Sequence, residues 1–257
     1  MVHIRTDSLL KTMLPVVHCM KRTYVVNRCM KQVTVCVEGN IGCGKTTFIS
    51  HFRKYDDFVE KHEEPVNLWR NYGDVNPLSA MYRDPKRWAF TFQSLVLLTL
   101  FQQHVQKQSK PIRVMERSVF SAKYCFVENQ RNRGLLNSFE YTLLNEMFGH
   151  ALMIKPINVD LIVYLRTSPE NCFHRIRKRN RPEEQNITLD YLQQLHQLHE
   201  SWLIKGDLST DQNQAEVSSL IKPPVLVVDG DCDKNTVEDK FPDIHSQIMS
   251  ELQVNLG

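Results

Sequence analysis

Short apolar runs alternate along this chain with longer stretches in which apolar side chains recur at helical spacing. The apolar runs predict five strands, at residues 33–37, 58–63, 112–115, 161–165 and 225–228. The longer stretches predict helices at residues 45–55, 85–108, 121–132, 138–154 and 237–252, and another that contains Tyr191, Leu195, Leu198 and Trp202. A further helix is expected to open at Thr167-Ser168-Pro169-Glu170, whose spacing fits a capping box.

The predicted strands carry apolar residues on both faces. Strands of this kind, separated by helices, predict an α/β fold in which helices flank a five-stranded parallel sheet. No repeat or low-complexity linker interrupts residues 33–257, so one domain is predicted there. Ligands of such sheets collect beyond the carboxyl ends of the strands. We therefore expect the residues that follow the strands to converge on one site.

A phosphate-binding loop follows the first predicted strand. Its G-x-x-x-x-G-K-T motif lies between a strand and a helix and consists of Gly39, Asn40, Ile41, Gly42, Cys43, Gly44, Lys45 and Thr46. The glycines let consecutive backbone N–H groups face one anion, and the helix N-terminus adds positive partial charge. We expect Lys45 to reach the β- and γ-phosphates and the Thr46 hydroxyl to bind Mg²⁺. The motif predicts a nucleoside triphosphate ligand, with an unliganded glycine-rich turn as the alternative.

Charged residues also follow the second and third strands. Glu64 precedes Pro65, which restricts Glu64 to an extended conformation, and its carboxylate can accept the proton of an attacking hydroxyl. Glu116 is a second candidate base, although its position beside the third strand better suits contact with Mg²⁺. Arg117 offers a planar set of donors to an oxygen near the reacting centre. Taken singly, Glu64 is typical of a helix N-terminus and Arg117 of a surface ion pair.

Residues 175–181 form an arginine-rich segment. Arg175 and Arg179 are four residues apart, as are Arg177 and Arg181, so we expect each pair to share a helix face. Segments this basic also occur as solvated helix faces or nucleic-acid-binding patches. In a chain with a phosphate-binding loop we favour a lid whose arginines neutralise charge on the transferred phosphate.

Composition limits the classes that fit. The chain has 257 residues, of which 42% are hydrophobic and 24% charged, as is typical of globular proteins. Its formal net charge of +3 is too small to indicate nucleic acid as the main partner. Seven cysteines without a C-x-x-C pair indicate a reducing compartment and neither a disulfide framework nor a zinc site. No apolar stretch is long enough to span a membrane, so no membrane partner is expected.

The first 32 residues form a basic leader. They contain six Lys or Arg residues and a single acid, Asp7. A leader so poor in acidic residues resembles a mitochondrial transit peptide, which predicts a mitochondrial location. A disordered basic tail on a protein of the cytosol or nucleus is the alternative.

Several motifs together resemble the animal deoxyribonucleoside kinases, in particular the mitochondrial thymidine kinase and broad-specificity deoxynucleoside kinase branches. They follow the family's order from about residue 33 to about residue 234. They comprise residues 37–47, Glu64-Pro65-Val66, Trp69-Arg70-Asn71, Met81-Tyr82, Phe92-Gln93-Ser94, Met115-Glu116-Arg117-Ser118, Ser121-Ala122-Lys123-Tyr124, Phe126-Val127-Glu128-Asn129, residues 164–170 and residues 198–204.

This resemblance implies a P-loop kinase fold over residues 33–257 with an arginine-rich lid, working on ATP and Mg²⁺. It implies transfer of the γ-phosphate to the 5′-hydroxyl of a deoxyribonucleoside in nucleotide salvage. Glu64 becomes the general base, Arg117 holds the same oxygen, and Glu116 falls near Mg²⁺. Carried over in the same way, Thr47 joins the ATP-binding loop, and the lid arginines that would meet phosphate are Arg175, Arg179 and Arg181.

The same resemblance assigns the nucleoside site. Trp69 and Phe126 would flank the base, and the amide of Gln93 would pair with it. Tyr82 and Glu184 would hold the 3′-hydroxyl of the sugar. The family also implies a homodimer formed through the helices at residues 85–108 and 121–154.

Two positions concern the choice of base. Family members that prefer deoxycytidine or purines carry an Arg and an Asp where this chain has Leu100 and Ala122. A pocket without those charges favours thymidine and deoxycytidine. Leu100 also departs from the nearest relatives, which carry Met there.

Three other functions share some of these features. A nucleoside monophosphate kinase has the same loop, sheet and lid, but it needs cations for the acceptor's phosphate, where this chain offers Trp69, Tyr82, Gln93 and Phe126. A GTPase is disfavoured because no N-K-x-D motif occurs. A non-catalytic accessory subunit of the respiratory chain resembles the family, but such a protein has no need of the Lys45, Glu64 and Arg117 found here.

Overall fold

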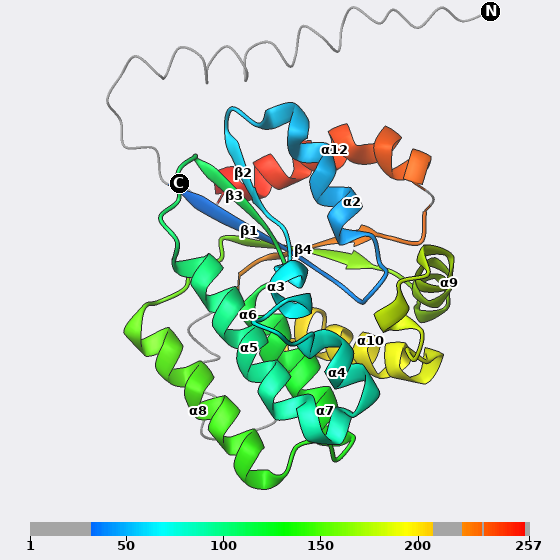
Figure 1. Cartoon of the computed structure of the whole chain (residues 1–257). Coiled ribbons are helices and arrows are strands. Elements are labelled where there is room, and N and C mark those ends of the chain that lie inside the picture. Colours follow the sequence, from blue (N-terminus) through cyan, green and yellow to red (C-terminus); the bar gives the residue numbers. More distant parts are fainter. Residues whose placement is uncertain (1–31, 208–222, 233, 255–257) are drawn as a thin grey trace, which may run out of the picture. The chain divides into compact units, whose positions relative to one another are not determined.

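A computed structural model of the chain describes residues 32–207, 223–232 and 234–254. The leader predicted at residues 1–32 lies outside this part, apart from Gln32. Five parallel strands form the sheet, in the order β2-β3-β1-β4-β5 (Figure 1). They are β1 (Val33–Glu38), β2 (Val59–His62), β3 (Ile112–Glu116), β4 (Leu161–Arg166) and β5 (Val225–Asp229). This confirms the five-stranded parallel α/β fold predicted from the sequence.

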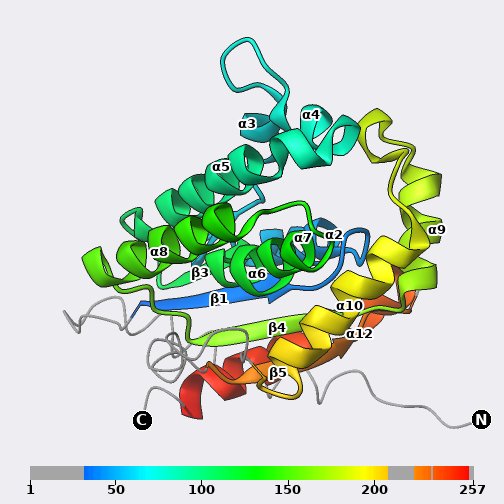
Figure 2. The same cartoon turned by 90° about the horizontal axis from the view of Figure 1, so that it is seen from below.

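Helices lie on both sides of the sheet (Figures 1 and 2). The α-helices are α2 (Lys45–Ser50), α3 (Val66–Arg70), α4 (Pro77–Arg83), α5 (Pro85–Val105), α6 (Val119–Ser121), α7 (Glu128–Asn132), α8 (Ser138–Ile154), α9 (Pro169–Arg179), α10 (Leu189–Leu203) and α12 (Lys234–Val254). The described residues also form two 3₁₀ turns, η1 (His51–Tyr55) and η3 (Pro182–Glu184), and one π-helical segment, η2 (Ala122–Val127).

Successive side chains of a strand lie on opposite faces of the sheet, and this alternation produces two apolar cores. In β1, Val35 and Val37 join a core with α2 and α12, whereas Cys36 between them joins a core with α5 and α8. In β4, Val163 and Tyr164 separate in the same way. Successive side chains of a strand point to opposite faces, so a strand buried on both faces must be apolar throughout. This requirement is why the apolar runs identified the strands.

The helices differ from the sequence predictions mainly at their ends. The predicted helix at 45–55 is α2 followed by the tighter η1, and the one at 121–132 is interrupted by the π-helical turn η2. Helix α5 ends at Val105, three residues early, because the next segment turns to lead into β3. There the Gln108 amide donates to the carbonyls of Val33, Lys110 and Pro111.

The capping box predicted at residues 167–170 is wrong. Ser168, and not Thr167, is the N-cap of α9, and its Oγ accepts from the Asn171 N–H. With Ser168 as the N-cap, the third helical residue is Asn171 and not Glu170, so Glu170 is out of position for the box. The N–H of Ser168 instead donates to Asp231 Oδ1 at 2.9 Å, a carboxylate from a distant loop.

Two further observations concern the described residues alone. None of their helices is long and apolar enough to cross a membrane. The five cysteines among them, Cys36, Cys43, Cys125, Cys172 and Cys232, are all free thiols.

Candidate active site

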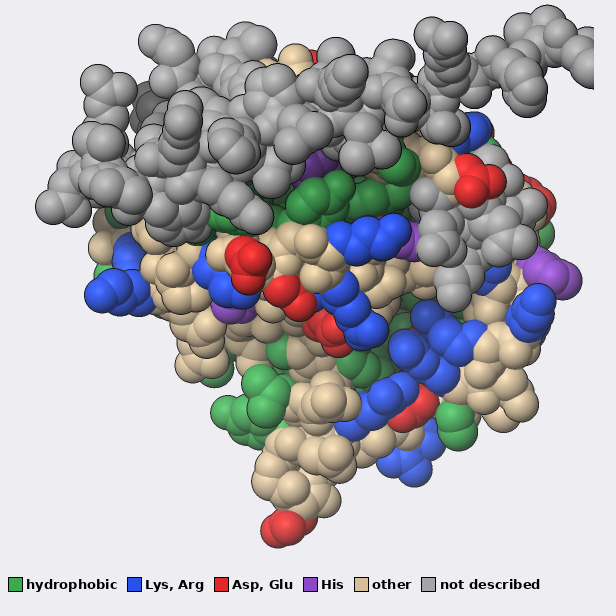
Figure 3. Space-filling model, turned by 90° about the horizontal axis from the view of Figure 1, so that it is seen from above, with side chains coloured by type: hydrophobic (Ala, Val, Ile, Leu, Met, Phe, Trp, Pro, Cys, Tyr) green, Lys and Arg blue, Asp and Glu red, His purple; other side chains and the backbone are tan. Residues whose placement is uncertain are grey.

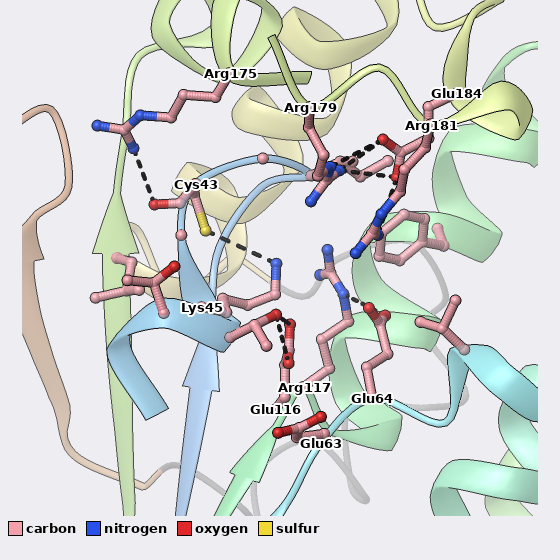
Figure 4. Close-up of a pocket in the computed structure, with 18 of the residues that line it drawn as sticks. Cys43, Lys45, Glu63, Glu64, Glu116, Arg117, Arg175, Arg179, Arg181 and Glu184 are labelled. Atoms are coloured by element: carbon pink, nitrogen blue, oxygen red, sulfur yellow. Dashed lines mark hydrogen bonds and ion pairs between the residues drawn. The ribbon is translucent and has the colours of Figure 1, made fainter. Parts of the chain in front are cut away.

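A cavity of about 890 Å³ opens beyond the carboxyl ends of the strands (Figure 4). The order β2-β3-β1 places the ends of the first three strands side by side there. Nearly all predicted site residues line the cavity: Ile41, Gly42, Cys43, Gly44, Lys45, Thr46, Thr47, Glu64, Trp69, Tyr82, Gln93, Glu116, Arg117, Ala122, Phe126, Arg175, Arg179, Arg181 and Glu184. Gly39 and Asn40 lie outside this lining, and Asn40 is buried with its amide donating to Leu192 O at 2.8 Å.

The loop after β1 needs its glycines. A Cβ on Gly42, whose φ is +80°, would lie 2.7 Å from the Cys172 carbonyl oxygen. A Cβ on Gly44 would lie 4.0 Å from Arg175 Nη1, an ordinary contact, but the φ of +103° is one that L side chains rarely adopt. Lys45 curls back over the loop, and its Nζ donates to Asn40 O at 2.9 Å and to Gly39 O at 3.2 Å. The loop therefore curls around the ammonium group of Lys45, which its own carbonyls hold in place.

Thr46 and Glu116 meet at the start of α2. The Thr46 hydroxyl lies 3.0 Å from both carboxylate oxygens of Glu116 (Figure 4). Burial, helped by the negative charge of Glu64, raises the pKa of Glu116. A hydroxyl and a carboxylate are oxygen donors that suit Mg²⁺, which keeps water and phosphate oxygens as its remaining ligands. No cluster of three potential metal-ligating side chains occurs within residues 32–207, 223–232 and 234–254. A metal here would thus depend on such outside ligands.

Arg117 and Glu64 form an ion pair deeper in the cavity. Arg117 Nε lies 2.8 Å from Glu64 Oε1, and the guanidinium stacks 4.7 Å from the ring centre of Phe126 (Figure 4). Arg117 Nη1 has no hydrogen-bond partner among the described residues. Burial acts to lower the Arg117 pKa, but Glu64 and then Glu38 outweigh it, so the group stays charged. This arrangement offers a base and a free donor to the same small region.

The backbone at Arg117 is strained. Its φ of +65° is one of two positive values among the described non-glycine residues. The Arg117 N–H donates to Val37 O at 3.0 Å, which extends the β1–β3 ladder by one residue. Strain of this kind persists where surrounding contacts over-determine it, and often at active sites. The turn directs the side chain of Arg117 into the cavity.

Glu38, the last residue of β1, was missed as a functional candidate. It is fully buried, and Ser118 Oγ donates to its Oε1 at 2.6 Å. Burial raises its pKa from 4.5 to about 7, opposed by Arg117 and Ser118. A charged residue at the end of an apolar strand, directly before the phosphate-binding loop, was the available sequence signal.

The opposite end of the cavity is apolar and aromatic. Trp69 packs edge-on against Phe92, with ring centres 5.9 Å apart, and its Nε1 donates to Thr99 Oγ1 at 2.9 Å. Gln93 is 1% exposed, and its Oε1 has no partner among the described residues. Leu100 and Ala122, at the two positions that concern base choice, both line the wall without adding charge. This end can therefore hold a flat, uncharged group that pairs with an amide.

The arginine-rich segment closes the cavity on a third side. Arg179 Nη2 donates to both oxygens of Glu184, at 2.8 and 2.7 Å, and Arg181 Nη1 lies 3.4 Å from Glu184 Oε1. Arg175 donates to the Cys43 carbonyl (Figure 4). It also donates to the Cys232 carbonyl, so it links α9 to two loops. Lys and Arg side chains gather beside a hollow on the face shown in Figure 3.

One expectation for this segment is wrong. Arg177 and Arg181 do not share a helix face, because α9 ends at Arg179 and Asn180 adopts a left-handed conformation with φ of +51°. Arg177 instead donates to the carbonyls of Gln185 and Ile187, away from the cavity. The left-handed residue redirects the chain and carries Arg181 to the cavity side.

Residues 228–232, the last two residues of β5 and the three that follow it, also line the cavity and were not predicted. Asp231 accepts hydrogen bonds from Ser168 and Asn171 at the start of α9. This charged loop contains no recognisable motif. The one sequence signal for it was its position after the last predicted strand.

Comparison with known proteins gives a consistent result. A family model described as deoxynucleoside kinase matches residues 35–253. The chain is 45% identical over 201 residues to thymidine kinase 2, mitochondrial, of Homo sapiens, covering 78% of this chain and 72% of that protein. It is 40% identical over 227 residues to the protein of that name from Macaca fascicularis, covering 88% and 82%. It is 32% identical over 248 residues to deoxycytidine kinase of Mus musculus, covering 85% and 89%.

Proposed function

The chain belongs to the deoxynucleoside kinase family, and from this premise we propose that it transfers the γ-phosphate of ATP to the 5′-hydroxyl of thymidine and deoxycytidine. The observation that carries the proposal is the Glu64–Arg117 pair, 2.8 Å apart, which lies in the same cavity as the phosphate-binding loop. Glu64 accepts the proton of the attacking hydroxyl, and Arg117 donates to the same oxygen as it becomes negative.

The phosphate side is assigned to the loop and the lid. Lys45 exchanges its loop carbonyls for the β- and γ-phosphates, and Arg179 and Arg181 stabilise charge on the transferred group. Thr46 and Glu116 would hold Mg²⁺, which neutralises phosphate oxygens when it is bound. The support for this metal site is the pairing of a hydroxyl with a buried carboxylate at 3.0 Å beside the loop.

The nucleoside side is assigned to the apolar end. The base lies between Trp69 and Phe126, and the unpartnered Gln93 amide oxygen pairs with it, the amide turning to suit thymine or cytosine. A neutral wall at Leu100 and Ala122 supports this pyrimidine preference. Tyr82 and Glu184 hold the 3′-hydroxyl, since both line the cavity between the base end and the lid.

A panel assay tests the proposal. With ATP and Mg²⁺, thymidine and deoxycytidine should be phosphorylated faster than deoxyadenosine and deoxyguanosine. Thymidylate should be a poor acceptor, because Arg70, the cation of α3 that lines the nucleoside end of the cavity, is already paired with Glu183. Preferred turnover of thymidylate would instead indicate a nucleoside monophosphate kinase. A folded protein that phosphorylates none of these compounds would support an accessory, non-catalytic role.

A homodimer is the proposed assembly. Phe139, Leu143 and Met147 recur every four residues along α8 and are exposed, as is Leu98 on the neighbouring α5. A stripe of this kind on a monomer is unusual, and a second copy of the same chain would cover it. Met147→Glu should convert a dimer to a monomer by size-exclusion chromatography with light scattering, whereas wild-type protein that is monomeric at micromolar concentration would refute the assembly.

The proposed location is mitochondrial. Two of the relatives reported above carry that location in their names, and the basic leader at residues 1–32 has the composition of a transit peptide. A fluorescent protein fused behind residues 1–32 should enter mitochondria. A diffuse or nuclear signal would favour the cytosol or nucleus.

A further inference from the structure

An ion pair joins the nucleoside end of the cavity to the arginine-rich segment. Arg70, the last residue of α3, places its Nε 2.9 Å from Glu183 Oε1 in η3, and its Nη2 donates to Oε2 at 3.5 Å. The two side chains are 28% and 14% exposed. An ion pair shielded to this degree is weakened less by water and salt than one on the open surface.

Each partner adjoins a residue assigned to substrate. Trp69, next to Arg70, is buried and anchored through its Nε1 to Thr99. Glu184, next to Glu183, accepts from Arg179 in the lid. A shift of either partner therefore moves a neighbour that faces the cavity.

The adjacent residues Glu183 and Glu184 point their carboxylates in different directions. Glu184 lines the cavity, whereas Glu183 points to Arg70 and is not part of the lining. Helix α4 also contacts η3, so this lid segment rests on the same side of the cavity as Arg70 (Figure 2). The Nε–H of Arg70 has no acceptor in hydrogen-bond geometry among the described residues. The attraction between opposite charges therefore contributes more to this ion pair than aligned bidentate hydrogen bonds do. The two side chains can separate without breaking a bidentate hydrogen-bonded pair.

We propose that Arg70 and Glu183 are positioning residues for phosphoryl transfer, and that their ion pair holds the arginine-rich segment against the nucleoside end of the cavity. This inference rests on the proposed function. Arg70 lines the cavity and Glu183 does not, and both act through their ion pair and not through contact with a substrate. Because the pair ties the wall that contacts the base to the segment that contacts phosphate, it makes nucleoside and ATP bind more tightly together than apart.

Charge exchange tests the proposal. Arg70→Glu and Glu183→Arg each place like charges together, and the double variant restores an opposite pair with reversed polarity. We expect each single variant to lower kcat/KM for thymidine about tenfold, and the double variant to recover to within about threefold of wild type. Arg166→Glu is the matched control. It disrupts an Arg–Glu pair of 2.6 Å, with Glu200, outside the cavity lining, so kcat/KM should stay unchanged.

Binding measurements separate positioning from a general structural role. The Kd of thymidine is measured by calorimetry with and without a non-hydrolysable ATP analogue. The analogue should tighten thymidine binding in wild type and the double variant, and much less in either single variant. Thermal melting checks that each variant is folded, and Glu183→Gln replaces any single variant that is not.

Two results would overturn the inference: single variants with wild-type coupling, or a double variant whose loss equals the product of the two single losses. A wild-type protein that phosphorylates no nucleoside would instead refute the proposed function, while the binding data would still report on the ion pair.

Discussion

Glu38 should give the folded chain a measurable pH dependence of stability, and Glu38→Gln should remove it. The carboxyl group is fully buried at the end of β1, and its Oε1 accepts a hydrogen bond from the Ser118 hydroxyl. Its Oε2 has no partner among the described residues. Burial raises the pKa from 4.5 to about 7, so between these values the folded chain holds a proton that the unfolded chain has released.

This bound proton determines the direction in which stability changes with pH. Stabilisation by Glu38 is complete below pH 4.5 and is lost as the pH rises through about 7. A pKa raised from 4.5 to about 7 corresponds to about 3 kcal/mol, because each pH unit contributes about 1.4 kcal/mol. The Gln side chain keeps the shape and the acceptor for Ser118 but cannot ionise. Between pH 5 and pH 8, the wild-type free energy of unfolding should therefore fall by about 2–3 kcal/mol relative to the variant.

Urea denaturation at half-unit steps from pH 5 to pH 8 measures this difference, since other titrating groups cancel between the two proteins. Asp56→Asn is the control. A hydrogen bond from Lys61 and the charges of Lys61, Lys110 and Arg53 lower the Asp56 pKa, so its contribution is lost only in acid. That variant should differ from wild type by a constant amount across the range. A constant difference for Glu38→Gln as well would refute the reasoning.

Three further predictions concern the cavity and its support. Glu64→Gln should lower kcat by about 10²-fold or more with little change in ATP affinity, as expected for loss of a general base; unchanged turnover in a steady-state assay would reassign the base. Lys45→Met should weaken ATP binding and lower kcat, and calorimetry showing wild-type ATP affinity would contradict its phosphate role. Lys123→Met should cost about 3–5 kcal/mol of folding free energy, because it removes the ammonium partner of the buried Glu128 carboxylate, to which the Tyr141 hydroxyl also donates. Urea denaturation tests this, and a loss below about 1 kcal/mol would show that Glu128 finds another partner.

The central strands β3, β1 and β4 were predictable from the sequence because burial on both faces demands apolar strands. Val35 and Cys36 are neighbours, yet they enter different cores, and neither position tolerates a polar group. Helices α3 and α4 were missed for the opposite reason. They are short and partly exposed, and their start signals, Pro65 and the Asn76 cap that accepts from Ser79, are local. Apolar periodicity has too few turns there to be visible.

The site was predictable where a motif or a strand end identified it, and less so where tertiary contacts decide the direction of a side chain. Lys45 and Thr46 follow from the loop motif alone. The ion pair between Arg70 and Glu183 does not, because no local pattern brings together residues 113 positions apart. The bend after Arg179 depends on the left-handed conformation of Asn180. Asn tolerates this conformation, but an Asn in the sequence does not by itself indicate it.

Arg117 shows how the fold stabilises a strained and charged residue at a functional position. A positive φ in a non-glycine residue costs about 1–3 kcal/mol, and burial of a guanidinium costs more. Against these costs stand the N–H bond to Val37, the ion pair with Glu64 and the ring of Phe126. The first contact comes from β1, the second from the end of β2, and the third from η2. The strand order β2-β3-β1 places Arg117 between the first two, and the same order places Glu64 beside the phosphate-binding loop. One topological feature thus accounts for both the tolerance of the strain and the convergence of the site.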